Sequence, residues 1–387
     1  MMTVIVFIAI LGLLVLVHEF GHFILARRNG VKVDEFGFGL PPRMFGVYLG
    51  SDGKWKLVGS KIREAERTIY SFNWLPLGGF VRMKGEEETE GPRLVESDSF
   101  ASKSIGARLR IISAGVSMNL LLAIVLLTIG FAVGSPQFID ETVPADARVR
   151  DQVIRVLEVL PDSPASSAGL QIGDTILEVD GQRVIAVTEF QEYITAHQAE
   201  SITFLIERDG QRQEQSLTPA ALPGLENPGI GIALVSTGTL SYPIYTAWWH
   251  ALVATGKMIV GILVGFAVVI KNLIFSQRLV AEVYGPVGIA GLVGDAVRLG
   301  WLYVLQFSAI LSIILAVVNY LPIPALDGGH ALFLVLEKIR GKRVDPKTQA
   351  RVTNVGFMAL MLLILVITIR DIARFSGGFL EWWTTLF

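Results

Sequence analysis

Residues 2–28 read MTVIVFIAILGLLVLVHEFGHFILARR. The run from Met2 to Ala26 is apolar except for His18, Glu19 and His22, and two arginines close it. A helix needs about 20 mostly apolar residues to cross a membrane, so this stretch predicts a transmembrane helix. A signal peptide would instead carry its positive charge before the apolar run and a small-residue cleavage site after it.

The composition agrees with a membrane protein. The 387 residues are 52% hydrophobic and only 18% charged, with a mean hydropathy of +0.54, whereas soluble domains carry about 25% charged residues. The net charge of -2 argues against nucleic acid as a partner. Because the chain has no cysteine, disulfides and thiolate ligands are excluded, and any metal must be held by nitrogen and oxygen atoms.

Three more apolar runs predict further spans, at 111–133, 301–318 and 355–369. The run from Trp248 to Phe275 contains two lysines and is ambiguous. It could cross the membrane or lie in the interface with its lysines and tryptophans at headgroup level, and we favour the interface. The predicted fold class is therefore a multi-pass α-helical membrane protein with four transmembrane helices, in contact with the lipid bilayer.

The distribution of charge predicts the orientation. Residues 27–110 contain 15 Lys/Arg, whereas residues 135–247 contain 6 Lys/Arg against 16 Asp/Glu. Basic loops stay in the cytoplasm, so the first and last loops are expected there and the acidic middle domain outside. A fifth span at Trp248–Phe275 would move the late basic loop outside, which is why we favour four.

The middle of the chain alternates short apolar runs with turns, which is typical of strands. Strands are expected at 153–160, 175–179 and 202–206, the last before Asp209-Gly210, and a short helix at 189–197. The run Ser163-Pro164-Ala165, Ala168-Gly169-Leu170, Gly173-Asp174 resembles a PDZ domain of the kind attached to bacterial proteases. PDZ domains bind extended peptides at a sheet edge, so a peptide ligand is an expected partner.

The polar residues of the first span predict a metal site. Positions i and i+4 share one face of a helix, so His18 and His22 can hold one Zn²⁺ together. Glu19 can then act as general base on the attacking water. Ionisable residues inside a membrane are costly, which favours a functional role. A proton relay is the main alternative.

Catalytic zinc has three protein ligands as a rule. The other polar cluster at a span's end is NYLPIPALDGGH, residues 319–330. We expect Asp327 to be the third ligand, since this cluster closes its span on the side where His18 and His22 lie. His330 is a weaker candidate.

These motifs together resemble the site-2 protease family of intramembrane zinc metalloproteases, in its bacterial branch that cleaves anti-sigma factors. The resemblance implies His18, His22 and Asp327 as ligands of one Zn²⁺ per chain, Glu19 as catalytic base and Asn319 as a residue that holds substrate backbone. It also implies a membrane-reentrant β-hairpin region that supports extended substrate. The glycine-rich segments that bracket this region include Gly37, Phe38, Gly39, Gly78 and Gly79.

The second span carries Gly115-Val116-Ser117-Met118-Asn119, where related sequences commonly have proline after the glycine. The retained glycine and asparagine predict close helix packing and a polar contact near the site.

The expected organisation follows the chain. The expected segments, in chain order, are the first span (1–28), the β region (29–104), the second span (105–134), the PDZ domain (140–222), the interfacial helix with the GPVGI segment (243–298), the third span (299–330), a basic loop (331–352), the fourth span (353–373) and a tail (374–387).

The sequence thus predicts an intramembrane zinc endopeptidase of the bacterial inner membrane, with its site near the cytoplasmic face. Its expected substrates are single-span membrane proteins, either anti-sigma factors or signal-peptide remnants. A zinc or proton transporter and an inert PDZ adaptor are the alternatives. A transporter would be expected to repeat its polar motif in two halves, and this sequence does not.

Overall fold

A computed structural model describes residues 2–60, 65–86, 96–139, 143–144, 146–198, 200–208, 210–222, 228–275 and 284–375. Most of the predicted tail, the residue Asp209 and the start of the predicted PDZ domain at 140–142 lie outside these residues. The chain forms two compact units, one from Met1–Leu127 with His250–Phe387 and one from Thr128–Trp249, which we call the middle domain.

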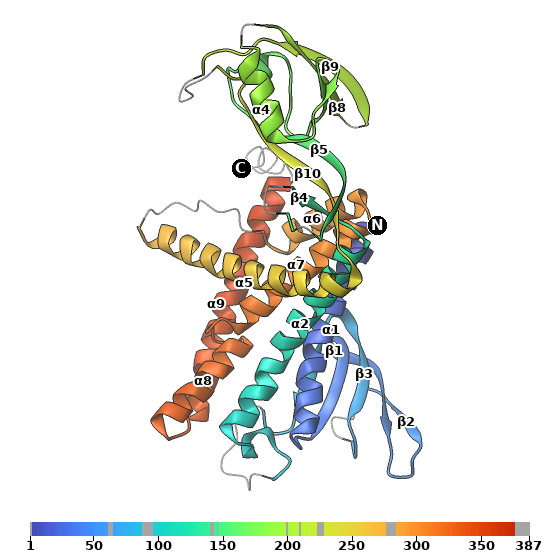
Figure 1. Ribbon diagram of the computed structural model, residues 1–387. Coiled ribbons are helices and arrows are strands. Elements are labelled where there is room, and N and C mark those ends of the chain that lie inside the picture. Colours follow the sequence, from blue (N-terminus) through green and yellow to red (C-terminus); the bar gives the residue numbers. More distant parts are fainter. Residues whose placement is uncertain are drawn as a thin grey trace, which may run out of the picture. The chain divides into compact units, whose positions relative to one another are not determined.

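The first unit combines helices with one small sheet (Figure 1). Its elements are α1 (Met2–Arg28), β1 (Val33–Leu49), β2 (Trp55–Val58), β3 (Ile69–Met83), the short 3-10 helix η1 (Phe100–Ser102), α2 (Ile105–Val133), α5 (Ile244–Phe275), α6 (Pro286–Leu299), α7 (Trp301–Tyr320), α8 (Asp327–Arg340) and α9 (Pro346–Phe375). Helices α2 and α5 run across the boundary between the two units.

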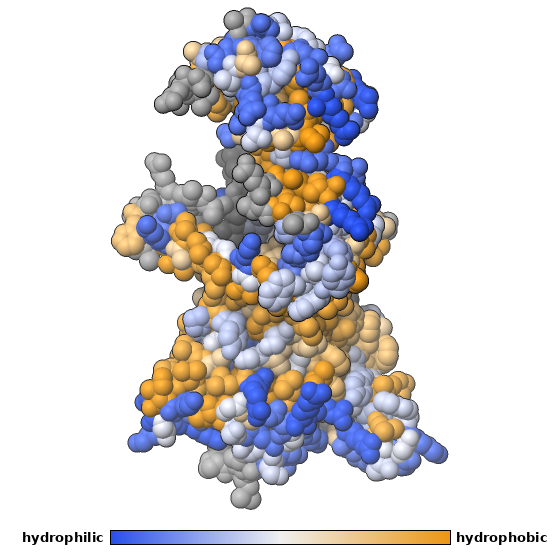
Figure 2. Space-filling model, in the orientation of Figure 1, coloured by the Kyte–Doolittle hydropathy of each residue, from blue (hydrophilic) through white to orange (hydrophobic). Residues whose placement is uncertain are grey.

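Five described helices are long and apolar enough to cross a membrane: α1, α2, α5, α7 and α9. No residue of the most apolar window of α9 is buried, and Figure 2 shows hydrophobic residues over much of the visible face of the first unit's helices. Apolar surface on this scale marks contact with lipid or another apolar partner. Because α5 also qualifies, the four-span arrangement stays a prediction.

The β region forms a three-stranded antiparallel sheet in the order β2-β1-β3. The last part of β3, residues 79–83, pairs with β1 residues 33–38. Among the described residues, no strand pairs with the other side of 79–83. Strand β3 packs against α1, so this open edge lies near the helix that carries the HEFGH motif.

The expected basic loop at 331–352 contains parts of two helices. Helix α8 runs to Arg340, and α9 already begins at Pro346. The apolar residues of α8 recur at helical spacing, and two of them, Ala331 and Leu334, are buried with α2 residue Ile112. Gly341 ends α8 in the left-handed conformation, at φ 66°, which glycine adopts without steric cost.

The middle domain is a seven-stranded sheet with two short helices. The sheet order is β4-β10-β5-β6-β8-β9, with β7 beside β6. The elements are β4 (Ser135–Phe138), β5 (Arg148–Val159), α3 (Pro164–Ser167), β6 (Thr175–Val179), β7 (Gln182–Arg183), α4 (Val187–Ala196), β8 (Ile202–Arg208), β9 (Gln211–Leu217) and β10 (Ile232–Ser241). The predicted strands at 153–160, 175–179 and 202–206 and the helix at 189–197 coincide with β5, β6, β8 and α4 to within a few residues. The core of the middle domain includes the fully buried residues Phe204, Ile176 and Ile202.

Candidate metal centre

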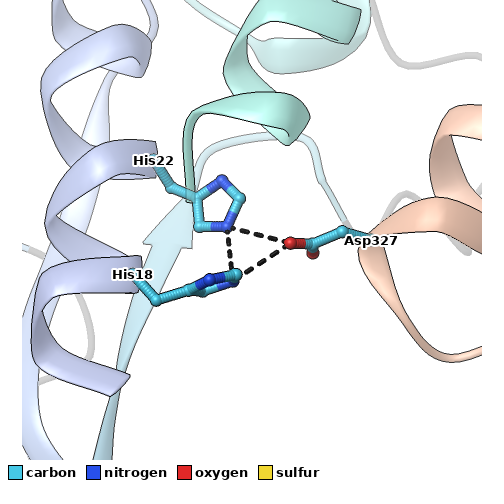
Figure 3. Close-up of side chains that lie close together, drawn as sticks. All are labelled: His18, His22 and Asp327. Carbon is cyan, nitrogen blue, oxygen red and sulfur yellow. Dashed lines mark hydrogen bonds and ion pairs between the residues drawn. The ribbon is translucent and has the colours of Figure 1, made fainter. Parts of the chain in front are cut away.

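Three side chains from two distant helices converge on one point (Figure 3). His18 and His22 lie one turn apart on α1, and Asp327 is the first residue of α8. The His18 Nε2 atom is 3.0 Å from Asp327 Oδ2, and the His22 Nε2 atom is 3.4 Å from the same oxygen. The two Nε2 atoms are 3.2 Å apart, so the three atoms form a nearly equilateral triangle.

This triangle has the size expected for zinc ligands. Zinc binds histidine nitrogen and carboxylate oxygen at about 2.0–2.2 Å in tetrahedral geometry, which places neighbouring ligand atoms about 3.3–3.5 Å apart. Asp327 Oδ2 is buried and has no hydrogen bond of normal geometry among the described residues. Its neighbours are the two imidazole nitrogens, and a cation at the centre of the triangle would bind all three atoms. The residues present therefore fit a zinc ion.

The backbone of α2 holds one of the imidazoles in position. His22 Nδ1 lies 2.9 Å from the carbonyl oxygen of Ile111, and a carbonyl can only accept, so the Nδ1–H donates. The proton is therefore on Nδ1, and the lone pair of Nε2 faces the triangle. This arrangement, with the second nitrogen hydrogen-bonded to a carbonyl, is typical of histidine metal ligands.

Glycines let α1 and α2 approach closely at the site. A Cβ atom on Gly115 of α2 would collide with the Nε2 atom of His22 and come within 2.7 Å of His18 Cε1. A Cβ atom on Gly21 of α1 would collide with the carbonyl oxygen of Ala114. Contacts this short are not tolerated, so the space for the imidazoles exists because both positions lack a side chain.

Glu19 lies next to the open edge of β3. A Cβ atom on Gly79 would be 3.6 Å from Glu19 Cγ. Glu19 itself is half-buried. Glu19 is thus next to the strand edge, and it directly follows His18 in α1.

The glycine-rich segments of the β region come together as paired strands. Gly37 pairs with Phe80, and Phe38 pairs with Gly79. Gly39 and Gly78 have φ angles of 81° and 91°, a conformation that favours glycine. Four of the five predicted residues, all except Gly39, are therefore in or next to the segment that borders Glu19.

Asn319 and His330 do not join the group. Asn319 is half-buried near the end of α7 and is not one of the three clustered ligand residues. His330 lies one turn along α8 from Asp327, and it is not one of the three clustered ligand atoms. The role of Asn319 stays a prediction.

Two contributors were not predicted. The Ile111 carbonyl that orients His22 belongs to the backbone, so no side-chain pattern could reveal it. Ser312 of α7 donates a hydrogen bond of 2.8 Å to the carbonyl oxygen of Asn119 and is fully buried. The expected polar contact from Asn119 is present, since its amide lies 3.3 Å from His18 Nδ1.

Comparisons with known proteins agree with this site. The sequence model of Peptidase family M50 matches residues 6–363. The zinc metalloprotease RasP of Geobacillus kaustophilus is 30% identical and aligns over 96% of this chain and 98% of its own length. RasP of Bacillus licheniformis is 28% identical and aligns over 97% of this chain and 99% of its own length.

The chain is also similar to solved structures of PDZ domains. The PDZ domain of the SdrC-like protein from Listeria monocytogenes is 28% identical, covering 21% of this chain and 85% of that domain with a TM-score of 0.20.

The family model and the full-length relatives cover both halves of the site, HEFGH in α1 and LDGG at the start of α8. Neither the transporter nor the inert adaptor accounts for this similarity to zinc metalloproteases. The chain therefore belongs to peptidase family M50, the site-2 protease family, and is an intramembrane zinc metalloprotease.

Proposed function

We propose that His18, His22 and Asp327 hold one Zn²⁺ per chain and that Glu19 is the general base of peptide hydrolysis. The observation that carries this proposal is the triangle of Nε2, Nε2 and Oδ2 atoms with edges of 3.0, 3.2 and 3.4 Å. Glu19 follows His18 directly in α1 and belongs to the HEFGH motif, in which the glutamate is expected to act on the attacking water.

The chemistry follows from these positions. A zinc ion held by these three residues would activate water for attack and polarise the scissile carbonyl. Glu19 takes the proton from the attacking water and returns it to the leaving amine. His22 keeps its Nε2 lone pair directed at the triangle because its Nδ1–H is held by Ile111.

The substrate is a single-span membrane protein, for which an anti-sigma factor or a signal-peptide remnant is the expected example. A helical segment must unwind before its carbonyl is accessible. The open edge of β3 at 79–83, beside Glu19, is a suitable place to hold the unwound chain as an added strand. Gly37, Phe38, Gly39, Gly78 and Gly79 would support this strand, and Asn319 would hold substrate backbone nearer the metal.

The proposed setting is the bacterial inner membrane with four spans and α5 in the interface. The site then lies near the cytoplasmic face, because arginines lie in the last turn of α1 and in the first turns of α2 at that end. The middle domain is extracytoplasmic and acts as a PDZ domain that binds a peptide. A groove of about 520 Å³ beside α4 and β10 supports peptide binding; its lining includes Phe190, Ile194 and Gly231.

The test is cleavage of a single-span protein with a different tag at each end, reconstituted with the purified enzyme in liposomes. We expect a cut inside the apolar segment, mapped by mass spectrometry, that stops with a zinc chelator and returns with added Zn²⁺. The Asp327→Asn variant serves as the control without activity. A cut in the aqueous flanks, or cleavage that persists after chelation, would contradict the proposal. An anti-sigma-type substrate and a signal-peptide remnant, compared in parallel, distinguish the two substrate classes.

A further inference from the structure

Asn119 of α2 is fully buried against the imidazole that is not fixed by a backbone carbonyl. Its side-chain Nδ2 lies 3.3 Å from His18 Nδ1, and its relative exposure is 0%. The other end of the amide, Oδ1, is buried and has no hydrogen-bond partner among the described residues. A buried amide with one end unpartnered is uncommon and calls for a reason.

The two orientations of this amide have opposite consequences for His18. If Nδ2 faces the imidazole, it donates to Nδ1, and the imidazole proton must lie on Nε2, the nitrogen that points to His22 and Asp327. If Oδ1 faces the imidazole, Nδ1–H donates to it, and the Nε2 lone pair is free for a metal. The oxygen and nitrogen of an amide are assigned from the surrounding hydrogen bonds, so the chemistry of the site can decide between them.

The main chain of Asn119 is held independently of its side chain. Ser312 of α7 donates to its carbonyl oxygen at 2.8 Å, and Ser312 is itself fully buried. A half-turn about the last side-chain bond is therefore enough to exchange Oδ1 and Nδ2 at His18, with no movement of α2. The same arrangement already exists at the second ligand, where the Ile111 carbonyl accepts from His22 Nδ1.

We propose that Asn119 is a positioning residue of the zinc site, whose Oδ1 accepts the Nδ1–H of His18 and so directs the Nε2 lone pair at the metal. This inference rests on the proposed zinc ligands. It makes the two histidines equivalent, each with a carbonyl-type oxygen behind it, one from the backbone and one from a side chain. Residues that orient metal ligands in this way typically change metal affinity by about 10–100-fold when they are lost.

The test compares two substitutions of similar size that differ in their hydrogen bonding. In Asn119→Asp the side chain can only accept, which suits a histidine that donates from Nδ1. In Asn119→Leu the side chain can neither accept nor donate a hydrogen bond. Ser117→Ala is the matched control, since Ser117 lies on the same helix, is exposed, and bonds only to the Ser113 carbonyl one turn back. Zinc affinity is measured on the full-length detergent-solubilised protein by competition with a chelator.

We expect Asn119→Asp and Ser117→Ala to keep zinc affinity within about threefold of the wild type and Asn119→Leu to lose about 10–100-fold. If the amide instead donates to His18, Asn119→Asp will lose at least as much affinity as Asn119→Leu, which would overturn the inference. So would an Asn119→Leu variant with wild-type affinity. If Asn119→Leu does not fold, judged by gel filtration, Asn119→Asp alone decides.

Failure of the zinc site itself gives a different result. A wild-type protein that holds no zinc, or holds it as well in His22→Ala, would refute the ligand set and this inference together. Zinc in the wild type that is lost in His22→Ala, combined with loss in Asn119→Asp, would refute only the role of Asn119.

Discussion

The Nε2 atom of His18 and the Oδ2 atom of Asp327 lie 3.0 Å apart, although one residue is in the first helix and the other begins α8. The tight turn before α8 makes this possible. A Cβ atom on Gly328 would collide with the backbone of Tyr320 and Leu321, so α8 can start directly against the end of α7 only with glycine there. The DGG sequence thus serves to bring Asp327 back to the depth of the HEFGH motif.

Gly115→Ala should damage the metal site without breaking the helix. The added methyl group would occupy the space of the two imidazoles, colliding with His22 and approaching His18 at 2.7 Å. We expect a loss of zinc affinity of at least about tenfold, comparable to the loss of a group that orients a ligand. The zinc affinity of the variant is measured by competition with a chelator.

Gly106→Ala is the matched control for this change. It lies in the same helix, and a Cβ atom there would meet no atom within 4 Å. Alanine has a higher helix propensity than glycine, so zinc affinity should stay unchanged and stability should not fall. Equal zinc affinity in Gly115→Ala and the wild type would show that the site tolerates a side chain at position 115, which would contradict the prediction.

Breaking the ion pair between Arg108 and Glu337 should destabilise the contact of α2 with α8. The Arg108 guanidinium lies 2.7 Å from the Glu337 carboxylate, and both side chains are about nine-tenths buried. Removing one partner of a buried pair costs about 3–5 kcal/mol because the other charge is left without compensation. Thermal unfolding of Glu337→Gln in detergent should show a clearly lower midpoint than the wild type.

An exposed ion pair provides the comparison. Asp295 and Arg298 lie 3.9 Å apart with side chains that are 66% and 85% exposed, and such pairs contribute about 0–1 kcal/mol. Asp295→Asn should therefore leave the unfolding midpoint nearly unchanged. A larger shift for Asp295→Asn than for Glu337→Gln would contradict this ranking.

The middle domain should lose stability in acid through Asp174. Burial raises the pKa of this carboxyl, but hydrogen bonds from the Arg208 guanidinium and the Gln171 N–H outweigh it, and the net pKa is lowered. A carboxyl with a lower pKa in the folded state stabilises the fold above its unfolded pKa of about 3.9. This contribution disappears as the pH falls through the folded pKa.

Asp174→Asn should therefore weaken the domain at neutral pH and matter less at low pH. Hydrogen exchange of the full-length protein, corrected for the intrinsic pH dependence of the rate, should show faster exchange of strands β6 and β8 in the variant at pH 7. The difference between variant and wild type should shrink as the pH falls below about 4. A difference that is constant with pH would mean that the carboxylate charge is not responsible.

The sequence predicted the spans and the ligands because each has a local signal. A run of apolar residues identifies a membrane helix, and the i, i+4 spacing of His18 and His22 places both imidazoles on one face of it. Asp327 could be predicted because few other polar clusters lie at the end of a span. The structure brings these three residues together.

Other features have no local signal. The hydropathy of α5 is the same whether it crosses the membrane or lies on its surface, so its placement stays a prediction. The basic charge at 331–352 does not reveal helix α8, which buries Ala331 and Leu334. The Ile111 carbonyl cannot be predicted, since any residue at that position offers the same backbone oxygen.

Glu19 is proposed to transfer the proton at a zinc ion that it does not itself hold. Cleavage of a single-span substrate by the wild type and by Glu19→Gln, with the zinc content of both purified proteins, tests this role. We expect about one zinc in each protein and a loss of cleavage of about 10²–10⁴-fold in the variant. Undiminished cleavage by Glu19→Gln, or an active wild type without zinc, would contradict it.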